Sequence, residues 1–187
     1  RTPRPLAEVA RRHGIETEEA DRRVARARAL LYAARAERIP PGLDDKILTA
    51  WNGLMIGAFA DGARILGEPR YLDAATRAAE FVLGTLQSPD GGLRRVYRAG
   101  QVRLDAYLED YAYLADGLVS LYEAGADERY LREARALVER IRTGFRAPDG
   151  GFYSTAERHE ALVLRPREGF DGATPSANAV AARALAR

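Results

Sequence analysis

Two short motifs recur in this sequence at one fixed spacing. The tripeptide Arg-Tyr-Leu occupies residues 70–72 and again residues 129–131, and the tetrapeptide Pro-Asp-Gly-Gly occupies residues 89–92 and again residues 148–151. Each motif is displaced by 59 residues, the difference between 70 and 129 and between 89 and 148. A fixed period indicates a repeat architecture, in which one supersecondary unit is copied along the chain and each copy packs on its neighbour.

Apolar residues at helical spacing predict helices of two kinds within each copy. One kind begins at Trp51 and recurs over residues 111–122, where apolar residues cover most of the circumference and charges are few. Such a helix is expected to be nearly surrounded by protein, and we call it an inner helix. The pattern from Asn178 to the end of the sequence predicts the start of a third inner helix.

The other kind carries one apolar stripe and a charged opposite side, which is typical of a helix with one face in water. Residues 71–86, 130–145 and 18–38 follow this pattern, and we call them outer helices. Outer and inner helices thus alternate along residues 17–187, and residues 1–16 form a connecting segment. An all-α fold is expected, and a unit of 59 residues with large loops favours an α/α toroid over an α-solenoid, whose repeats span about 34 to 47 residues.

Composition excludes several kinds of protein. The chain has no cysteine, so disulfides, zinc–cysteine sites and a redox dithiol are excluded within these residues. No apolar run approaches the roughly 20 residues that span a bilayer and no leader resembles a signal peptide, so a soluble, cytoplasmic protein without membrane contact is expected. Lys and Arg total 29 against 27 acids, with the two signs mixed along the chain, which disfavours nucleic-acid binding.

The two ends and the two histidines carry further expectations. The sequence begins with Arg1 and stops within an alanine-rich helical pattern, so a fragment holding about half of a toroid is expected. His13 and His159 belong to no ligand-spaced pair, so neither a metal site nor a cofactor is expected.

The connections between the helices are unequal. Inner helices are expected to return to outer ones through short turns, whereas residues 39–49, 88–108 and 147–175 lead from an outer helix to the next inner one. The last two connections open with the Pro-Asp-Gly-Gly turn and continue with alternating residues, which predict β-hairpins over 93–104 and 152–164. All three long loops are expected at the same end of the helices, where a rigid scaffold usually carries its binding groups.

Acidic, aromatic and amide side chains gather where these loops enter the inner helices, in three motifs at residues 43–53, 105–113 and 168–178. The candidate catalytic carboxylates are Glu109, Asp110, Asp105, Asp45 and Asp171. The candidate substrate-binding residues are Lys46, Trp51, Asn52, Tyr107, Tyr111, Glu168 and Asn178. This mixture suits sugars, because aromatic faces stack on pyranose rings, amides and carboxylates bind hydroxyls, and two carboxyl groups can divide acid and base roles at a glycosidic bond.

The acids have different expected roles. The expected proton donor is Glu109, Asp110 or Asp105, and the expected base is Asp45 or Asp171. Lys46 is the only lysine among many arginines, which indicates that an ammonium group is preferred beside Asp45.

Each residue also has a purely structural interpretation. Acids in the first turn of a helix interact favourably with the helix dipole, and under this interpretation Glu109 and Asp110 serve only as caps. Trp51 and Tyr111 fit a helix core as well as a sugar platform. The further N-cap candidates are Thr49, Thr174 and Ser176.

The three motifs together resemble one family. They include Leu-Asp-Asp-Lys at residues 43–46, Trp-Asn-Gly-Leu-Met-Ile at 51–56, Leu-Glu-Asp-Tyr-Ala at 108–112 and Asp-Gly-Ala at 171–173, followed by Pro175, Ser176 and Asn178. This pattern is similar to the C-terminal helical part of the thioredoxin-domain-containing YyaL type, which includes the spermatogenesis-associated thioredoxin-like proteins. The resemblance covers nearly the whole chain.

The resemblance implies a partial (α/α)6 toroid, similar to six-hairpin glycosidases and N-acylglucosamine 2-epimerases. It also implies that the full-length protein carries an N-terminal thioredoxin-like domain, which these residues do not include. Carbohydrate-related activity is implied through fold kinship alone. The sugar epimerases of this fold use histidines for proton transfer and the three motifs contain none, which favours carboxylate-based hydrolysis or sugar binding over 2-epimerase chemistry.

Two functional hypotheses follow. The first is a glycosidase-like toroid that binds a carbohydrate between carboxylates facing one cleft. The alternative is a non-enzymatic protein-interaction or scaffold module that supports the thioredoxin-like domain and exposes an apolar patch at its loop end.

Overall fold

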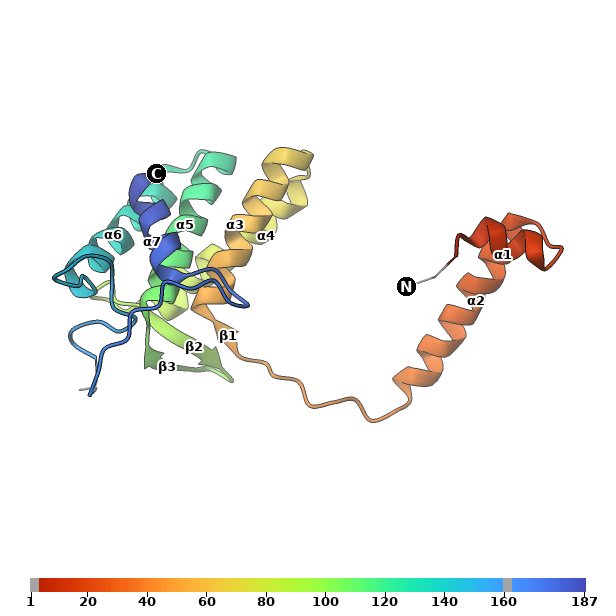
Figure 1. The fold of residues 1–187 in the computed structure, drawn as a ribbon, viewed down its shortest axis with the longest axis horizontal. Coiled ribbons are helices and arrows are strands. Elements are labelled where there is room, and N and C mark those ends of the chain that lie inside the picture. The colour runs from red at the N-terminus through yellow and green to blue at the C-terminus, as the bar shows by residue number, and fades with distance from the viewer. Residues whose placement is uncertain (1–3, 160–162) are drawn as a thin grey trace. The chain divides into compact units, whose positions relative to one another are not determined.

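A computed structural model describes residues 4–159 and 163–187 and divides the chain into two compact units, of which the second begins at Asp45 (Figure 1). The first unit contains α1 (Leu6–Arg12) and α2 (Thr17–Ala36). The helix predicted over residues 18–38 is therefore present. Its apolar stripe, including Leu31, is exposed, and its role as an outer helix stays a prediction.

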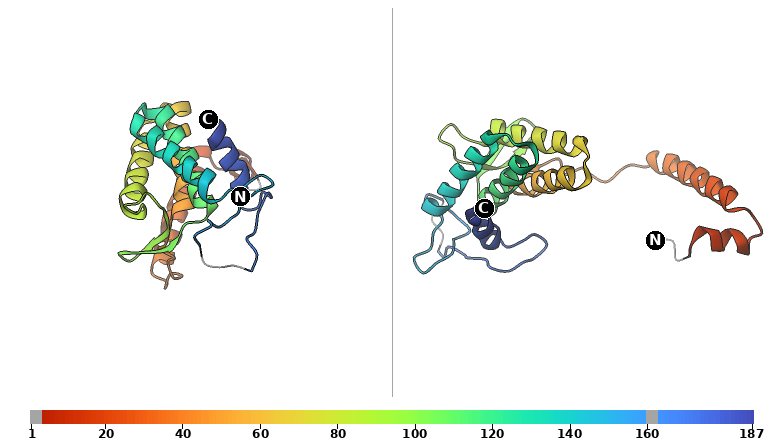
Figure 2. Two further views of the ribbon diagram at one scale, coloured as in Figure 1. Left: turned by 90° about the vertical axis from the view of Figure 1, so that its left-hand side faces the viewer. Right: turned by 90° about the horizontal axis from the view of Figure 1, so that it is seen from above.

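The second unit carries the helices and strands of the repeat. Its helices are α3 (Thr49–Leu66), α4 (Pro69–Phe81), a π-helical turn that continues α4 (Val82–Leu86), α5 (Leu108–Gly125), α6 (Glu128–Gly144) and α7 (Ala177–Ala186). Helices α3 and α4 form one antiparallel pair, α5 and α6 form the next, and α5 packs against both α3 and α7 (Figure 2). The predicted alternation of inner and outer helices is confirmed for these five helices.

Local sequence explains where these helices begin and end. Gly67 ends α3 with a φ of 68°, a left-handed conformation that costs glycine little. Pro69 then occupies the first turn of α4, where its missing N–H is not needed. Asp127 caps α6, because its side chain accepts a hydrogen bond from the Arg129 amide at 2.9 Å.

The burial pattern distinguishes the inner helices from the outer ones. In α5 every residue from Asp110 to Leu121 is buried, whereas α6 buries only one stripe. The expectation that both inner helices are nearly surrounded is right for α5 and wrong for one side of α3. Trp51 and Met55 are 61% and 48% exposed, because α4 and α5 cover only the opposite side of α3.

The β-structure confirms one predicted hairpin. Strands β2 (Arg94–Arg98) and β3 (Gln101–Asp105) pair antiparallel, with Val96 opposite Arg103. An additional short strand, β1 (Ile47–Leu48), pairs with β2 and extends the sheet directly into α3.

The hairpin predicted over residues 152–164 is wrong for its described part, residues 152–159 and 163–164; residues 160–162 lie outside the described part of the chain. Most backbone hydrogen bonds of this segment reach residues outside it, and none forms a hairpin ladder. The Tyr153 amide donates to the Phe145 carbonyl, the Ser154 amide donates to the Pro166 carbonyl, and the Ser154 carbonyl accepts from the Leu108 amide. The segment therefore joins the end of α6 to the start of α5.

Glycines set the distance between α3 and α5. A Cβ atom on Gly117 would lie 2.4 Å from the Gly53 carbonyl oxygen, and a Cβ atom on Gly53 would lie 2.5 Å from the Leu114 amide nitrogen. Contacts this short involve backbone atoms on both helices, so a side chain could enter only if the helices moved apart.

We predict that Gly117→Ala lowers the free energy of unfolding by about 3 kcal/mol or more, because the added methyl group overpacks a backbone contact. Urea unfolding of the chain measures the effect. Gly144→Ala in α6 is the matched control, because nothing lies within 4 Å of its added Cβ. Equal stability of the Gly117→Ala variant and the wild type would contradict this packing.

Candidate functional site

The three motif-bearing ends of α3, α5 and α7 lie at the same end of the second unit (Figure 1). Two hydrogen bonds join them directly. The Ala50 amide of α3 donates to Asp110 of α5, and the Tyr113 hydroxyl of α5 donates to the Pro175 carbonyl before α7. The structure thus brings the three motifs to a common rim.

Asp110 joins the N-terminal ends of two helices. Its carboxylate accepts hydrogen bonds from the Ala50 amide at 2.9 Å and from the Tyr107 amide at 2.8 Å, the second completing a capping box on α5. Arg95 of β2 lies 3.1 Å away and donates to the same carboxylate. Asp110 is fully buried, and the structure therefore supports the capping interpretation for this acid.

Burial raises the pKa of Asp110 to about 6, although Arg95 and the two backbone amides act in the opposite direction. Desolvation thus outweighs a close positive charge and two hydrogen bonds. The carboxylate is stabilised in its protonated form relative to the same group in water.

Glu109, the next residue, lies in a different environment. Its carboxylate pairs with Arg95 at 2.7 Å, and its side chain is 31% exposed. The Arg95 guanidinium also lies over the Tyr107 ring, 4.7 Å from its centroid. The Tyr107 ring stacks in turn on His159, with centroids 5.2 Å apart. Arg95, which also binds Asp110, therefore holds Glu109 at the rim.

Two adjacent cavities open beside Glu109, with volumes of about 410 and 540 Å³. Glu109 and Glu168 line both cavities, so we call the pair of cavities the Glu109–Glu168 cleft. The smaller cavity is also lined by Arg95 and Tyr107, and the larger one by the exposed Phe170. These volumes lie in the range of small-molecule sites.

Thr155 contributes a polar group at the smaller cavity. The residue lines that cavity and is only 5% exposed, and its hydroxyl has no hydrogen-bond partner within the described part of the chain. A buried polar group without a partner costs free energy.

The other candidate acids do not line this cleft. Asp171 accepts from the Ser176 amide at 2.7 Å, next to the start of α7. Asp45, which precedes β1, pairs with Arg98 of β2 at 2.5 Å, and Asp105 of β3 pairs with Arg94 of β2. Of the five candidate catalytic acids, the structure brings only Glu109 to the cleft, together with Glu168.

The remaining candidate binding residues fall into two groups. Trp51 and Lys46 are exposed near the start of α3, whereas Tyr111 is buried and its hydroxyl accepts from the Leu93 amide at 2.9 Å. Asn52 and Asn178 hold backbone in place. The Asn52 amide group donates to the Leu48 carbonyl, and the Asn178 amide group donates to the Phe152 and Glu168 carbonyls and accepts from the Phe152 amide.

The N-cap predictions had mixed outcomes. Ser176 is the N-cap of α7 and accepts from the Ala179 amide, as predicted. Thr49 is not an N-cap, because Leu48 occupies that position and the Thr49 hydroxyl donates to the Arg94 carbonyl at 2.6 Å. The Thr49 side chain therefore links the start of α3 to strand β2. Thr174 is not an N-cap of α7 either, because Ser176 occupies that position.

Sequence reasoning missed Arg95, Thr155 and the contact of His159 with Tyr107. Arg95 is one of many arginines, and Thr155 and His159 lie in the segment predicted as a hairpin. The one signal that could have pointed to Arg95 is its positive charge, three residues after the Pro-Asp-Gly-Gly turn and ahead of the acidic start of the next helix. Among residues 4–159 and 163–187, no cluster of three His, Asp or Glu side chains could hold a metal ion, and no helix is long and apolar enough to cross a membrane.

The pKa of Asp110 predicts a pH-dependent stability. Because the folded pKa of about 6 exceeds the ordinary value of 3.8, the stability that this group contributes is fully present below pH 3.8 and is lost as the pH rises through 6. The free energy of unfolding of the wild type, minus that of Asp110→Asn, should fall by about 2 kcal/mol between pH 4 and 7.

Urea titrations at several pH values measure this difference. Asp149→Asn is the control, because Arg167 lowers the pKa of the exposed Asp149 and the dependence should take the opposite sign. A difference between the wild type and Asp110→Asn that does not change with pH would contradict the assignment.

No family model matches the chain. Spermatogenesis-associated protein 20 from Homo sapiens is 35% identical over 190 residues, which cover 96% of this chain and 24% of the human protein. The Mus musculus protein of the same name is 36% identical, with the same coverage of both chains.

Solved structures share the fold at low sequence identity. A sugar epimerase from a ruminal bacterium is 17% identical with a TM-score of 0.58, over 65% of this chain and 34% of the epimerase. A family 76 α-mannanase from Bacteroides thetaiotaomicron is 19% identical with a TM-score of 0.55, over 63% of this chain and 34% of the mannanase. A family 105 glycoside hydrolase from C. acetobutylicum is 12% identical with a TM-score of 0.59, over 96% of this chain and 53% of the hydrolase.

These likenesses establish the fold as part of an (α/α)6 toroid of the kind found in glycosidases and sugar epimerases. They also confirm the resemblance drawn from the three motifs. The chain is similar to spermatogenesis-associated protein 20, and it spans about a quarter of the length of these curated relatives.

Proposed function

We propose that the Glu109–Glu168 cleft binds a carbohydrate and that its two carboxyl groups act on a glycosidic bond. The observation that carries this proposal is the different use of two neighbouring acids. Asp110 is fully occupied by two helix ends, whereas Glu109 remains partly exposed and lines both cavities with Glu168.

The lining of the smaller cavity suits a sugar. Tyr107 provides an aromatic ring, Glu109 and Glu168 provide acceptors for hydroxyl groups, and Thr155 provides a buried hydroxyl without a partner within the described residues. Carboxylates and hydroxyls bind the hydroxyl groups of a pyranose, and an aromatic face packs against its C–H groups.

The two carboxyl groups have distinct proposed roles. Glu109 is ion-paired with Arg95, which suits an acceptor that receives a proton from water or from a sugar hydroxyl. Glu168 forms no ion pair with any described residue, which suits the donor that protonates the leaving oxygen. Asp110 positions Arg95 and the start of α5, and does not contact the ligand.

The names of the structural neighbours agree in chemical class, since they include a sugar epimerase and glycoside hydrolases. Fold kinship at this level of identity supports the class of ligand and not the reaction. In the full-length protein we propose a cytoplasmic location and a thioredoxin-like domain as the partner of the toroid.

A scaffold function is the second candidate. Trp51 and Met55 lie one turn apart on α3 and are both largely exposed, which favours a surface that contacts another protein segment. Under this alternative the cleft is a relic, and no sugar binds to it.

The test is a glycan array followed by titration of the bound glycans. We predict that Glu109→Gln and Glu168→Gln each weaken binding about tenfold or more, because each removes a charged acceptor from the cleft. If the reaction is hydrolysis, both variants also lose turnover of the same glycan.

Glu128→Gln is the control, because this exposed acid at the start of α6 lies outside the cleft. Asp110→Asn separates positioning from contact, since it should lower stability in a pH-dependent way as described above. Absence of glycan binding by the wild type, or equal binding by all variants, would refute the carbohydrate function and favour the scaffold.

A further inference from the structure

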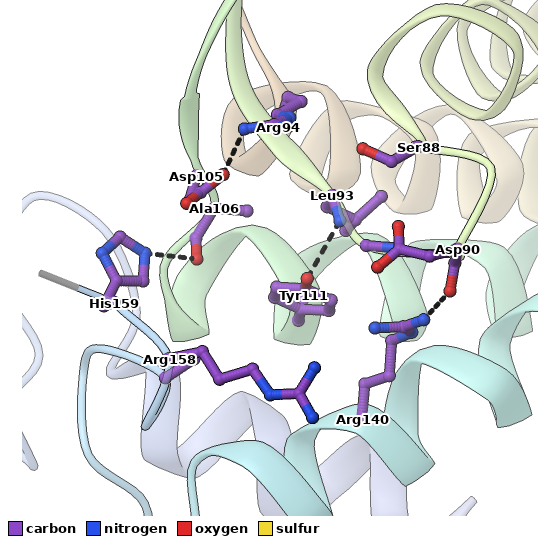
Figure 3. Close-up of a pocket in the computed structure, with 12 residues that line it drawn as sticks. Ser88, Asp90, Leu93, Arg94, Asp105, Ala106, Tyr111, Arg140, Arg158 and His159 are labelled. Atoms are coloured by element: carbon purple, nitrogen blue, oxygen red, sulfur yellow. Dashed lines mark hydrogen bonds and ion pairs between the residues drawn. The ribbon is translucent and has the colours of Figure 1, made fainter.

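A second hollow lies beneath the β2–β3 hairpin and beside α6 (Figure 3). It shares no lining residue with the Glu109–Glu168 cleft. It consists of two contiguous cavities of about 210 and 600 Å³. Both are lined by Tyr111, Arg140, Ala156 and Arg158. We call this hollow the Arg140–Arg158 pocket.

Two guanidinium groups converge in this pocket from different elements. Arg140 extends from α6, and Arg158 extends from the turn after residue 156, so that its guanidinium points towards Arg140 below the Tyr111 ring (Figure 3). Arg140 and Arg158 belong to different elements, and only the fold brings their side chains together.

Among the described residues, no carboxylate neutralises either guanidinium. Arg140 donates to the backbone carbonyl of Asp90, and neither Arg140 nor Arg158 forms an ion pair with a carboxylate of residues 4–159 or 163–187. Two like charges facing one hollow repel each other, and an anion between them removes this cost.

Most of the acids that line this hollow already have a partner, and Glu157 is the exception. Asp105 pairs with Arg94, and the Asp90 carboxylate accepts from the Gly92 amide. Glu139 pairs with Arg142 on the outer side of α6. Glu157 also lines the hollow and is exposed to water. Arg140 and Arg158 therefore remain the groups with unused donors inside the pocket.

The buried Tyr111 ring gives this pocket a rigid apolar wall, since its hydroxyl already accepts from the Leu93 amide. His159 closes another side, with its Nε2 atom 3.3 Å from the Ala106 carbonyl. The same imidazole stacks on Tyr107, which lines the Glu109–Glu168 cleft. The stacked pair thus stands between the two sites.

We propose that the Arg140–Arg158 pocket binds an oxyanion group, a phosphate, sulfate or carboxylate, through both guanidinium groups. Arginine forks match the geometry of such groups and form charge-assisted hydrogen bonds with them. The proposal is independent of the carbohydrate function, because it uses none of the residues of the Glu109–Glu168 cleft.

The test uses the whole chain, titrated with inorganic phosphate, sulfate and acetate at an ionic strength held constant with sodium chloride. The side-chain Nε–H resonances of arginine in NMR spectra report binding, and the three anions distinguish the chemical source. A saturable shift of the Arg140 and Arg158 resonances is expected for at least one anion. Arg140→Gln and Arg158→Gln should each weaken the apparent affinity about tenfold.

Arg135→Gln is the matched control, because this exposed arginine lies on α6 outside the pocket. Arg158→Gln is the decisive variant, because the exposed Arg158 makes no hydrogen bond or ion pair to described residues and its replacement should leave the fold intact. Binding that is unchanged in Arg158→Gln, or no saturable shift with any of the three anions, would overturn the proposal.

Discussion

The close crossing of α3 and α5 is the contact on which the rest of the second unit depends. Gly53 and Gly117 meet backbone to backbone, so the two helices approach more closely than side chains would allow. This approach brings the start of α3 within reach of Asp110, which then accepts hydrogen bonds from the first turns of both helices. The close packing of the two helices and the hydrogen bonds of Asp110 therefore stabilise the same crossing.

This crossing also determines the chemistry available at the rim. Because Asp110 is buried between two helix ends, its charge orients Arg95, and Arg95 in turn holds Glu109 beside the cleft. The neighbouring acids in one motif thus receive separate roles from helical geometry, since successive residues point about 100° apart around a helix. Burial raises the pKa of Asp110 to about 6, because a carboxylate that joins two helix ends in the interior is removed from water.

The sequence predicted the helices well because the 59-residue repeat and the apolar spacing are both local signals. It could not assign roles to Glu109 and Asp110, because an acid in a first turn suits a cap and a site equally well until the depth of each side chain is known. It also misjudged residues 152–159, whose alternating pattern resembles a strand although the Ser154 backbone bonds to Pro166 and Leu108. Such bonds depend on residues distant in sequence and leave no periodic signal.

Hydrogen exchange of the Ala50 amide tests the central claim most directly. If this amide donates to Asp110 in the interior between α3 and α5, it should exchange only through global unfolding, with a protection free energy equal to the stability of the second unit. Exchange at the rate of an unprotected amide would show that the two helix ends do not meet. The shared rim, and with it the placement of Glu109, would then be wrong.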